Sequence, residues 1–495
     1  MSETQPIELD AGTPEIDLAQ VKKRSVAGVV ALTSRTFVIQ IISFAATLLL
    51  TILLAPEIYG IFFLVSSVVN FLTYFSDVGL AAALIQKKTK LVRADLVTTF
   101  TIQQSLVILL LILLFSLTPY IRNFYGMSSA AIYLMWAFGI SLFLSSLKTI
   151  PSVLLEREIQ FNKLIIPQIA ETLVFNFVAV YFAWIGYGVT AFTLAVLLRG
   201  VTGLVIMYIV SPWLPALGIN KKSLSHLLKF GLPYQANTLL AVIKDDGMTI
   251  ILGKIIGTTG LGYIGWASKW ANMPLRIFMD NVTKVAFPAF ARLQNNKKKL
   301  GLAIQKSIFY LALVTLPILV SMGLLARPLI DIIPRYQKWL PALIPLYLYL
   351  FNAAWASLST PLTNALNAIG KIKITFRLML MWTGLTWALM PFLAIKFGYL
   401  GVSYAAALIA TSSLVVFIVI KKYVSFSLPS ALKTPLIASA ALAIYLYSSI
   451  GFVTDYFSLT LISLGGVIIY TVAIIFLEGK SFIKNTLNYF KLGKQ

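Results

Sequence analysis

The stretch KKTKLVRADLVTTFTIQQSLVILLLILLFSLTP, residues 87–119, holds the pattern that decides the fold. Four basic residues lie within its first seven positions, and an apolar run over residues 94–119 follows them. A helix needs about 20 mostly apolar residues to cross the hydrocarbon core of a bilayer, and this run is long enough. The stretch therefore predicts a transmembrane helix with a cluster of positive charge at one end.

The same pattern recurs along nearly the whole chain. Fourteen apolar segments are separated by short polar connections, and we predict a helical membrane span at each of them. The predicted spans are residues 25–54, 58–85, 94–119, 130–155, 162–185, 188–211, 230–255, 262–290, 303–326, 339–367, 374–395, 398–420, 432–451 and 457–477. Because this number is even, we expect both ends of the chain on the same side of the membrane.

Basic residues are distributed unevenly between the two sides of this arrangement. Of the 40 Lys and Arg residues, 27 lie in the connections or at the span ends on the side of the N-terminus, six lie likewise on the opposite side, and seven lie deeper within the spans. Short loops rich in Lys and Arg remain on the cytoplasmic side. We therefore expect a multi-pass protein of the prokaryotic cytoplasmic (inner) membrane whose N- and C-termini both face the cytoplasm.

The composition excludes a soluble protein. Hydrophobic residues make up 59% of the chain and charged residues 12%, and the mean hydropathy is +0.88. In water, such a chain would expose a large apolar surface. The net charge of +23 does not indicate nucleic acid as a partner, because the basic residues lie in small clusters beside apolar spans, where they determine topology and contact lipid headgroups.

Few side chains are available for metal or covalent chemistry. The chain has no cysteine and a single histidine, His226, in a basic loop. Disulfides, thiolate metal sites and a cysteine nucleophile are therefore excluded. We expect no metal, no cofactor and no enzymatic activity.

The two halves of the chain resemble each other in three places that follow the same order. The matching segments are residues 56–62 and 260–265, residues 83–88 and 291–299, and residues 186–189 and 398–402. Each half contains six spans, so both begin in the same orientation and a pseudo-twofold axis along the membrane normal would relate them. We predict an all-α integral membrane protein of two six-helix lobes around a central cavity, with two further C-terminal helices.

This organisation divides the chain into six parts. They are a disordered cytoplasmic tail (1–24), an N-lobe of six spans (25–211), a cytoplasmic linker (212–229), a C-lobe of six spans (230–420), the last two spans (421–478) and a cytoplasmic tail that is a candidate amphipathic helix (479–495). The connections between spans are short. A membrane glycosyltransferase or ligase, which needs an extended external loop, is therefore disfavoured.

Twelve charged residues lie more than four residues from either end of their predicted spans. The basic ones are Arg35, Lys148, Arg199, Lys244, Lys269, Arg276 and Lys284, and the acidic ones are Asp77, Glu171, Asp245, Asp246 and Asp280. A charge at the bilayer centre is unfavourable by at least about 2.5 kcal/mol, so each should face protein or water and is a candidate for function. The surplus of positive charge predicts a cavity that binds an anionic group.

The eighth span carries a polar stripe. Lys269, Arg276, Asp280 and Lys284 are spaced by seven, four and four residues, which places them on one face of a helix. Lipid cannot solvate such a stripe, so it must line water, a ligand or partner charges. We assign Arg35, Arg199, Lys269 and Arg276 to substrate binding.

The acidic residues have two interpretations. Asp280 and the aspartates of span 7 either form structural salt bridges, with Lys244 as one partner, or couple transport to an ion. Lys148 and Glu171 lie on successive spans and can pair, and Asp77 can cap a helix end. Ion coupling through Asp77, Glu171, Asp245 or Asp246 stays open alongside these structural roles.

Two motifs resemble those of a known family. These are Asp77-Val-Gly-Leu near the end of span 2, and Gly262-Tyr263 followed through span 8 by Phe287-Pro-Ala-Phe-Ala-Arg-Leu-Gln294. With the arrangement of six, six and two spans, they resemble the polysaccharide flippases of the MOP superfamily, the Wzx-type transporters of O-antigen and exopolysaccharide. The resemblance covers roughly residues 20–480.

The resemblance implies that the chain flips an undecaprenyl-pyrophosphate-linked oligosaccharide from the inner to the outer leaflet by alternating access of its two lobes. It implies a pyrophosphate site that includes Lys244 besides Arg35, Lys269 and Arg276. Expected partners are the lipid-linked substrate, membrane lipids and glycan-assembly enzymes, with the protein itself a monomer. The alternatives are a MATE-like, cation-coupled drug or metabolite antiporter, which should have an acidic, aromatic cavity, and a lipid II flippase.

Overall fold

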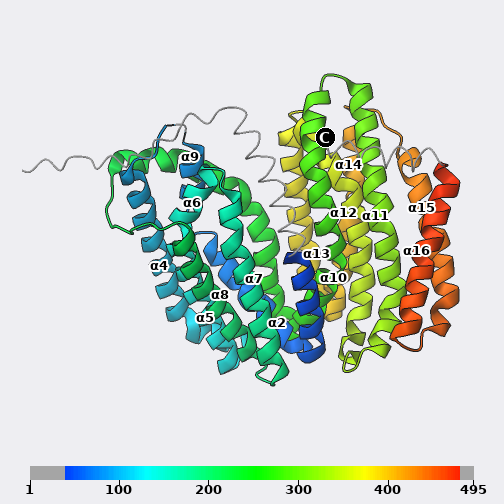
Figure 1. Cartoon of the computed structure of the whole chain (residues 1–495), viewed down its shortest axis with the longest axis horizontal. Helices are drawn as coiled ribbons and strands as arrows, with labels where there is room; N and C mark the ends of the chain where they lie inside the picture. Colours follow the sequence, from blue (N-terminus) through cyan, green and yellow to red (C-terminus); the bar gives the residue numbers. More distant parts are fainter. Residues whose placement is uncertain (1–38, 88, 480–495) are drawn as a thin grey trace, which may run out of the picture.

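The described part of the chain is built of helices. The computed structural model describes residues 39–87 and 89–479, and within these residues there is no β-strand (Figure 1). The prediction of an all-α protein is confirmed. Arg35 and both terminal tails lie outside the described residues.

One group of helices, at the left of Figure 1, comes from the first half of the chain. Its elements are α2 (Pro56–Thr73), α3 (Leu80–Gln86), α4 (Arg93–Tyr125), α5 (Ser129–Leu147), α6 (Thr149–Arg157), α7 (Phe161–Trp184) and α8 (Val189–Val210). A helical segment, Ile39–Leu53, precedes α2.

The second group, at the right of Figure 1, comes from the second half. Its elements are α10 (Met248–Leu293), α11 (Lys297–Ile332), a 3₁₀ helix η2 (Gln337–Ala342), α12 (Leu343–Ala368), α13 (Ile372–Thr411), α14 (Leu414–Lys421), α15 (Leu428–Ser449), a 3₁₀ helix η3 (Ile450–Phe452) and α16 (Tyr456–Glu478).

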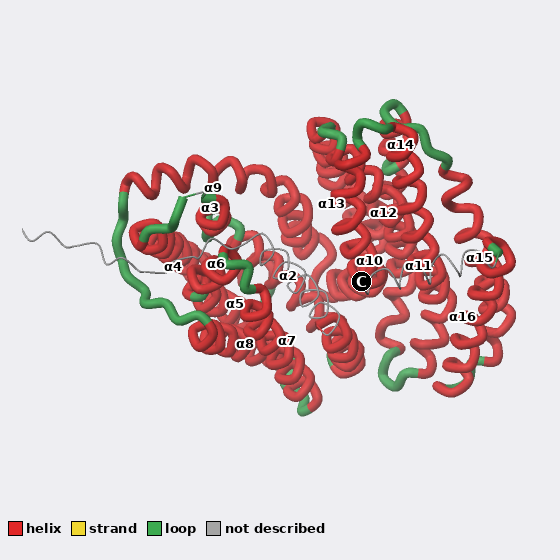
Figure 2. Tube along the Cα trace, turned by 45° about the horizontal axis from the view of Figure 1, so that its top comes forward, coloured by secondary structure: helices red, strands yellow, loops and turns green. Residues whose placement is uncertain are grey.

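Helix α9 (Lys221–Val242) and the π-helix η1 (Ile243–Gly247) connect the two groups. Helix α9 runs along one end of the first group toward α13 (Figure 2). It packs closely on the turn before α3, because a Cβ atom added to Gly231 would lie 2.8 Å from the Val78 carbonyl oxygen. The predicted linker, residues 212–229, is thus helical from Lys221 onward.

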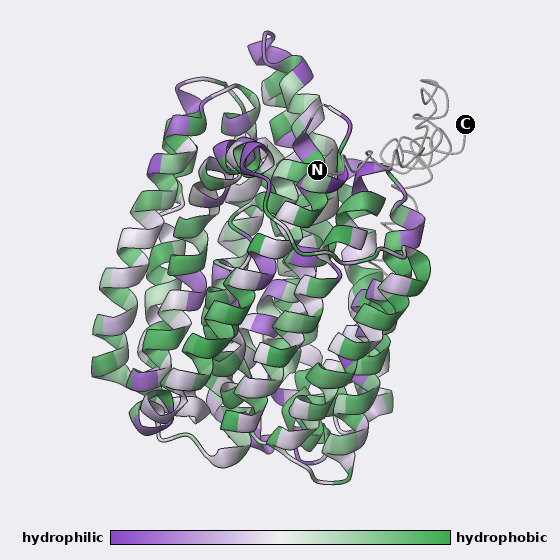
Figure 3. Ribbon diagram, turned by 90° about the vertical axis from the view of Figure 1, so that its left-hand side faces the viewer, coloured by the Kyte–Doolittle hydropathy of each residue, from purple (hydrophilic) through white to green (hydrophobic). Residues whose placement is uncertain are grey.

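Ten of the helical segments are long and apolar enough to cross a membrane. Hydrophilic residues gather at the two ends of the helices and hydrophobic ones between them (Figure 3). Helices α9 and α10 are not among the ten, and α10 carries Lys269 and Arg276 within its length. The chain is a multi-pass membrane protein, and α10 lies at the junction of the two groups.

Two pairs of predicted spans, 230–255 with 262–290 and 374–395 with 398–420, follow each other with no loop between helices except for one non-helical glycine in each pair. Gly257 has φ 69° and ψ 175° within α10, and Gly398 has φ 62° and ψ −143° within α13. A positive φ is readily adopted only by glycine, so the chain reverses there without a polar loop. Helices α10 and α13 each therefore contain segments of two predicted spans.

The two groups meet where α2 crosses α10. A Cβ atom added to Gly60 would lie 1.6 Å from the Thr258 carbonyl oxygen, and one added to Gly262 would lie 1.9 Å from the Pro56 carbonyl oxygen. Neither distance is sterically possible, so the backbones approach this closely only because both residues are glycine. The contact fixes one end of α10 against the first group.

Aromatic residues of η2 strengthen the same contact. Trp339, which is fully buried, stacks on Trp266 of α10 with ring centroids 5.2 Å apart, and lies edge-on to Tyr59 of α2. Tyr336 Oη lies 3.0 Å from Thr51 Oγ1 and accepts a hydrogen bond from Trp266 Nε1 at 3.1 Å. The buried core of the molecule thus runs across the boundary between the groups.

Candidate functional site

The face of α10 that contacts α2 continues as a basic surface. Gly262 and Gly265, packed against Pro56 and Phe63 of α2, fall with Lys269 and Arg276 within about 60° around the helix axis. Lys269 and Arg276 are exposed, whereas Ala267, Ala271 and Leu275 on the other faces are buried. The same face of α10 is thus packed against α2 at Gly262 and Gly265, and is exposed further along the helix at Lys269 and Arg276.

The basic pair on α10 has no acidic partner among the side chains that the structure describes. Arg276 is close enough to Lys269 for the two positive charges to repel each other. None of the salt bridges found in the described residues involves either of them. The side chains of Asp280 and Lys284 lie outside the described residues, so their predicted part in the stripe stays a prediction.

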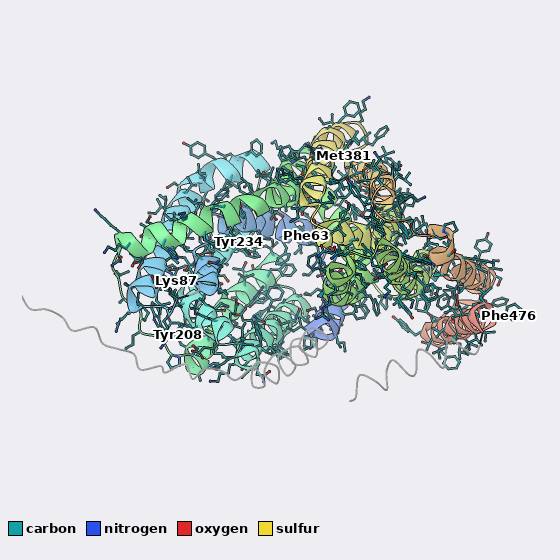
Figure 4. All side chains as sticks on the ribbon, turned by 90° about the horizontal axis from the view of Figure 1, so that it is seen from above. Phe63, Lys87, Tyr208, Tyr234, Met381 and Phe476 are labelled. Carbon is teal, nitrogen blue, oxygen red and sulfur yellow. The ribbon has the colours of Figure 1, made fainter. Side chains whose placement is uncertain are left out.

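Helix α2 presents polar residues beyond its own contact with α10. Phe63 lies at the centre of the molecule in the view of Figure 4, between the two groups. One and two turns further along the same face of α2, Ser67 and Asn70 lie beside Asp246 of η1. Past its contact with α10, the α2 face is thus polar rather than apolar.

The π-helix η1 brings the predicted residues of span 7 to this region. Lys244 Nζ lies 2.8 Å from Asp245 Oδ1, so the predicted pairing within this span is confirmed. Asp245 is largely exposed, and Gly247 packs against the Trp387 ring of α13. A π-helical turn widens the helix and often occurs at functional sites.

A third cationic centre lies within the first group. Glu171 of α7 forms an ion pair with Lys148, which confirms the pairing considered from the sequence. Its second carboxylate oxygen lies 3.6 Å from Nε of Arg199 on α8. The guanidinium group of Arg199 also lies over the Phe175 ring, 5.9 Å from its centroid. Arg199 therefore has an acidic partner, whereas no described acidic side chain pairs with Lys269 or Arg276 of α10.

Asp77 has a local structural role. Both of its carboxylate oxygens accept hydrogen bonds from the backbone N–H of Ala81, at 3.1 and 3.2 Å. The following Gly79 has φ 76°, which turns the chain into α3. Asp77 thus accepts a hydrogen bond from the first turn of α3, and its possible coupling role stays a prediction.

An apolar cavity of about 490 Å³ separates the segment Ile39–Leu53 from α7. Ala46 and Leu49 line one side, and Phe177, Tyr181 and Trp184 line the other. With a helical rotation of 100° per residue, Phe177, Tyr181 and Trp184 lie on the side of α7 that faces away from Glu171 and Phe175. The cavity is therefore separate from the Arg199 centre.

Sequence reasoning missed the contacts made by η2. Tyr336 lies in the predicted polar connection 327–338 and Trp339 directly after it. Nothing in their spacing indicates that they contact Thr51.

Within the described residues, there is no group of three His, Asp or Glu side chains suited to a metal ion.

The fold and these residues define a helical membrane protein with cationic side chains at and near the junction of two helix groups. A model of the polysaccharide biosynthesis protein family matches residues 49–343, more than half of the chain. The chain belongs to this family, and the resemblance to Wzx-type flippases of the MOP superfamily is confirmed.

Individual relatives agree with this assignment. The chain is 24% identical to the teichuronic acid biosynthesis protein TuaB of Bacillus subtilis over 77% of its own length and 80% of the relative's. It is 23% identical to the lipopolysaccharide biosynthesis protein WzxC of Escherichia coli over 33% of each chain. The structure of the lipid II flippase MurJ in an inward closed conformation superimposes with a TM-score of 0.72, at 18% identity, over 90% of this chain and 98% of MurJ. The last likeness concerns the fold.

Proposed function

We propose that this protein is a flippase that moves an undecaprenyl-pyrophosphate-linked oligosaccharide from the inner to the outer leaflet of the cytoplasmic membrane. In this proposal the chain has fourteen spans, as two six-helix lobes and two C-terminal helices, with both termini in the cytoplasm. The lobes alternate between two openings around a central cationic cavity. The family assignment supports transport of a lipid-linked glycan.

The backbone supports the internal repeat on which this proposal depends. Gly188, before α8, has φ 54° and ψ −124°, and Gly398, before the second segment of α13, has φ 62° and ψ −143°. Gly186, which matches Gly398 in the repeat, also has a positive φ, 89°, so both connections contain glycines in the left-handed region. In addition, Gly60 and Gly262, from matching segments at the start of spans 2 and 8, pack against each other, as residues near a twofold axis do.

One observation carries the substrate proposal: the exposed basic face of α10. Lys269 and Arg276 continue the helix face that Gly262 and Gly265 pack against α2, which supports assigning them to the proposed cavity between the lobes. Phosphate oxygens bind well to the planar arginine fork and to the lysine ammonium group. We assign the pyrophosphate to Lys269 and Arg276, with Arg35, Lys244 and Arg199 as further contributors, while the polyprenyl chain remains in lipid.

Contacts between the two lobes close one end of the proposed cavity. The contacts of Thr51, Tyr336 and Trp339 close the molecule on the side that the charge distribution predicts to face outward. Passage of the headgroup requires these contacts to separate while the opposite end closes. The polar headgroup then crosses without entering hydrocarbon.

Reconstituted vesicles test this function. A fluorescent polyprenyl-pyrophosphate oligosaccharide is incorporated in both leaflets, and the fraction accessible to an external reagent is followed over time. We expect Arg276→Ala and Lys269→Ala each to lower the rate about 10-fold or more, the usual effect of a lost charge-assisted hydrogen bond. Lys396→Ala, an exposed residue of α13, serves as the matched control. Equal rates in all four proteins would overturn the assignment, and preferential transport of lipid II would identify a lipid II flippase instead.

A further inference from the structure

The ion-pair centre formed by Lys148, Glu171 and Arg199 has an arrangement that the proposed function leaves unexplained. Two cations share one carboxylate, so the centre carries one net positive charge inside the membrane. The three side chains are unequally exposed: Lys148 is 18% exposed, Glu171 11% and Arg199 52%. The net charge is therefore accessible at Arg199.

Lys148 is the closer of the two partners of Glu171. Its ammonium group is in direct hydrogen-bond contact with one carboxylate oxygen, whereas Arg199 reaches the other oxygen only through Nε at 3.6 Å. A carboxylate that already has a close cation attracts a second one less strongly. Arg199 is thus oriented by Glu171 but not neutralised by it.

The remaining nitrogens of Arg199 are available for a ligand. The contact with Glu171 is made through Nε, and the guanidinium carbon lies over the Phe175 ring, 5.9 Å from its centroid. This leaves the two terminal nitrogens, the fork that binds phosphate or carboxylate through two parallel hydrogen bonds. A buried ion pair and an aromatic ring thus hold a half-exposed arginine in a fixed orientation.

The surrounding helices fix this centre in place. Gly203 of α8 makes room for Glu171, because a Cβ atom there would lie 2.0 Å from Oε1. Lys148 stands at the break between α5 and α6, three residues before Pro151. Pro151 has no N–H for the Leu147 carbonyl oxygen, and Tyr208 of α8 donates a hydrogen bond to that oxygen instead, at 3.0 Å.

We propose that Arg199 is a second oxyanion-binding group for the transported glycolipid, and that Lys148 is a positioning residue which neutralises Glu171 so that Arg199 keeps its charge for the ligand. The inference rests on the proposed function and extends it from the face of α10 to the other lobe. The ligand group is a phosphate of the lipid carrier or a carboxylate of an acidic sugar. In this arrangement Lys148 increases anion affinity without touching the anion.

A double-mutant comparison tests the role of Lys148. Binding of two probes, farnesyl pyrophosphate and trigalacturonic acid, is measured by calorimetry on the purified full-length protein. Lys148→Met should weaken binding of at least one probe about 10-fold, because Glu171 then captures Arg199. The double variant Lys148→Met/Glu171→Gln should return to within about twofold of the wild-type affinity, because Arg199 is free again. Arg199→Lys should weaken the same probe about 10-fold, since lysine has no planar fork.

A matched control separates this role from general stability. Lys87 and Asp95 form a comparable pair in the same lobe, with Nζ and Oδ2 2.5 Å apart and Asp95 buried. Lys87→Met should lower thermal stability without changing the affinity for either probe. A double variant as weak as Lys148→Met, or wild-type affinity in Lys148→Met and Arg199→Lys for both probes, would overturn the inference. If Arg276→Ala still lowers the transport rate about 10-fold or more in that case, the proposed function survives while the Arg199 site does not.

Discussion

Trp339 donates its indole N–H to the backbone carbonyl oxygen of Thr51, 2.8 Å away, and so joins the second helix group to the first. Lys338 adds a hydrogen bond to the neighbouring carbonyl of Ile52 at 2.7 Å. Residues separated by nearly 290 positions thus form one contact. Alternating access requires this contact to be reversible, and its few hydrogen bonds suit a contact that opens.

Trp339→Phe should favour the state in which the two groups separate at this end. The substitution keeps most of the ring packing and removes one hydrogen bond, worth about 1 kcal/mol, which corresponds to a population shift of about fivefold. The chain has no cysteine, so spin labels at Glu57→Cys and Gln337→Cys need no background removal. Pulsed electron paramagnetic resonance should show more long distances than in the otherwise unchanged protein.

Trp382→Phe is the matched control for this experiment. Its indole N–H donates to Ser412 Oγ at 3.1 Å, within the second group only. The control should leave the distance distribution unchanged. A distribution that responds to neither substitution would show that the Trp339 hydrogen bond does not hold this end closed.

Gly60→Ala should disrupt the crossing of α2 and α10. The new methyl group would overlap the Thr258 carbonyl oxygen, so the helices must move apart. Overpacking of this kind lowers the free energy of unfolding by about 1–3 kcal/mol. Thermal unfolding in detergent measures the change, and Gly384→Ala, which meets no atom within 4 Å, is the control. Equal unfolding temperatures in the two variants would contradict the close crossing.

Gly203→Ala should affect Glu171 more than the fold as a whole. Its methyl group would occupy the position of Glu171 Oε1, so the carboxylate must turn away from Lys148 and Arg199. We expect weaker anion binding at Arg199 by about 10-fold. Adding Glu171→Asp, which shortens the side chain, should recover part of the affinity in calorimetry. No recovery would indicate that α8 itself is displaced.

Tyr208→Phe should destabilise the break between α5 and α6. The Leu147 carbonyl oxygen then loses its hydrogen bond, which lowers the free energy of unfolding by about 1–2 kcal/mol. Pro151→Ala restores a backbone N–H for that oxygen, so the double variant should be less affected than Tyr208→Phe alone. If the losses of thermal stability in the two single variants simply add in the double variant, Tyr208 does not replace the missing backbone N–H of Pro151.

Much of the fold follows from the sequence because membrane spans depend on local composition. The spacing of Lys269 and Arg276 sufficed to place them on one face of α10, since a helix has a fixed period. The pairing of Lys148 with Glu171 was also predictable, because few partners exist for a charge in the membrane. The break at Lys148, inside the predicted span 130–155, was not, because it depends on contacts with other helices.

The junction of the two groups was beyond sequence reasoning for a similar reason. The close approach at Gly60 and Gly262 and the pairing of Thr51 with Tyr336 depend on how segments far apart in sequence pack together. The approach of Arg199 to Glu171 likewise joins two helices whose packing had to be seen. Local patterns predict which residues are unusual, and the tertiary structure determines which of them meet.

In the proposed function, the basic face of α10 lines a water-accessible space that binds an anionic lipid. Asn272 lies on this face between Lys269 and Arg276, and Asn272→Cys gives a single thiol in a chain without cysteine. The thiol should react with a water-soluble, membrane-impermeant maleimide in vesicles, and farnesyl pyrophosphate should slow the reaction. A thiol that reacts only after denaturation, or at a rate indifferent to the pyrophosphate, would contradict the account.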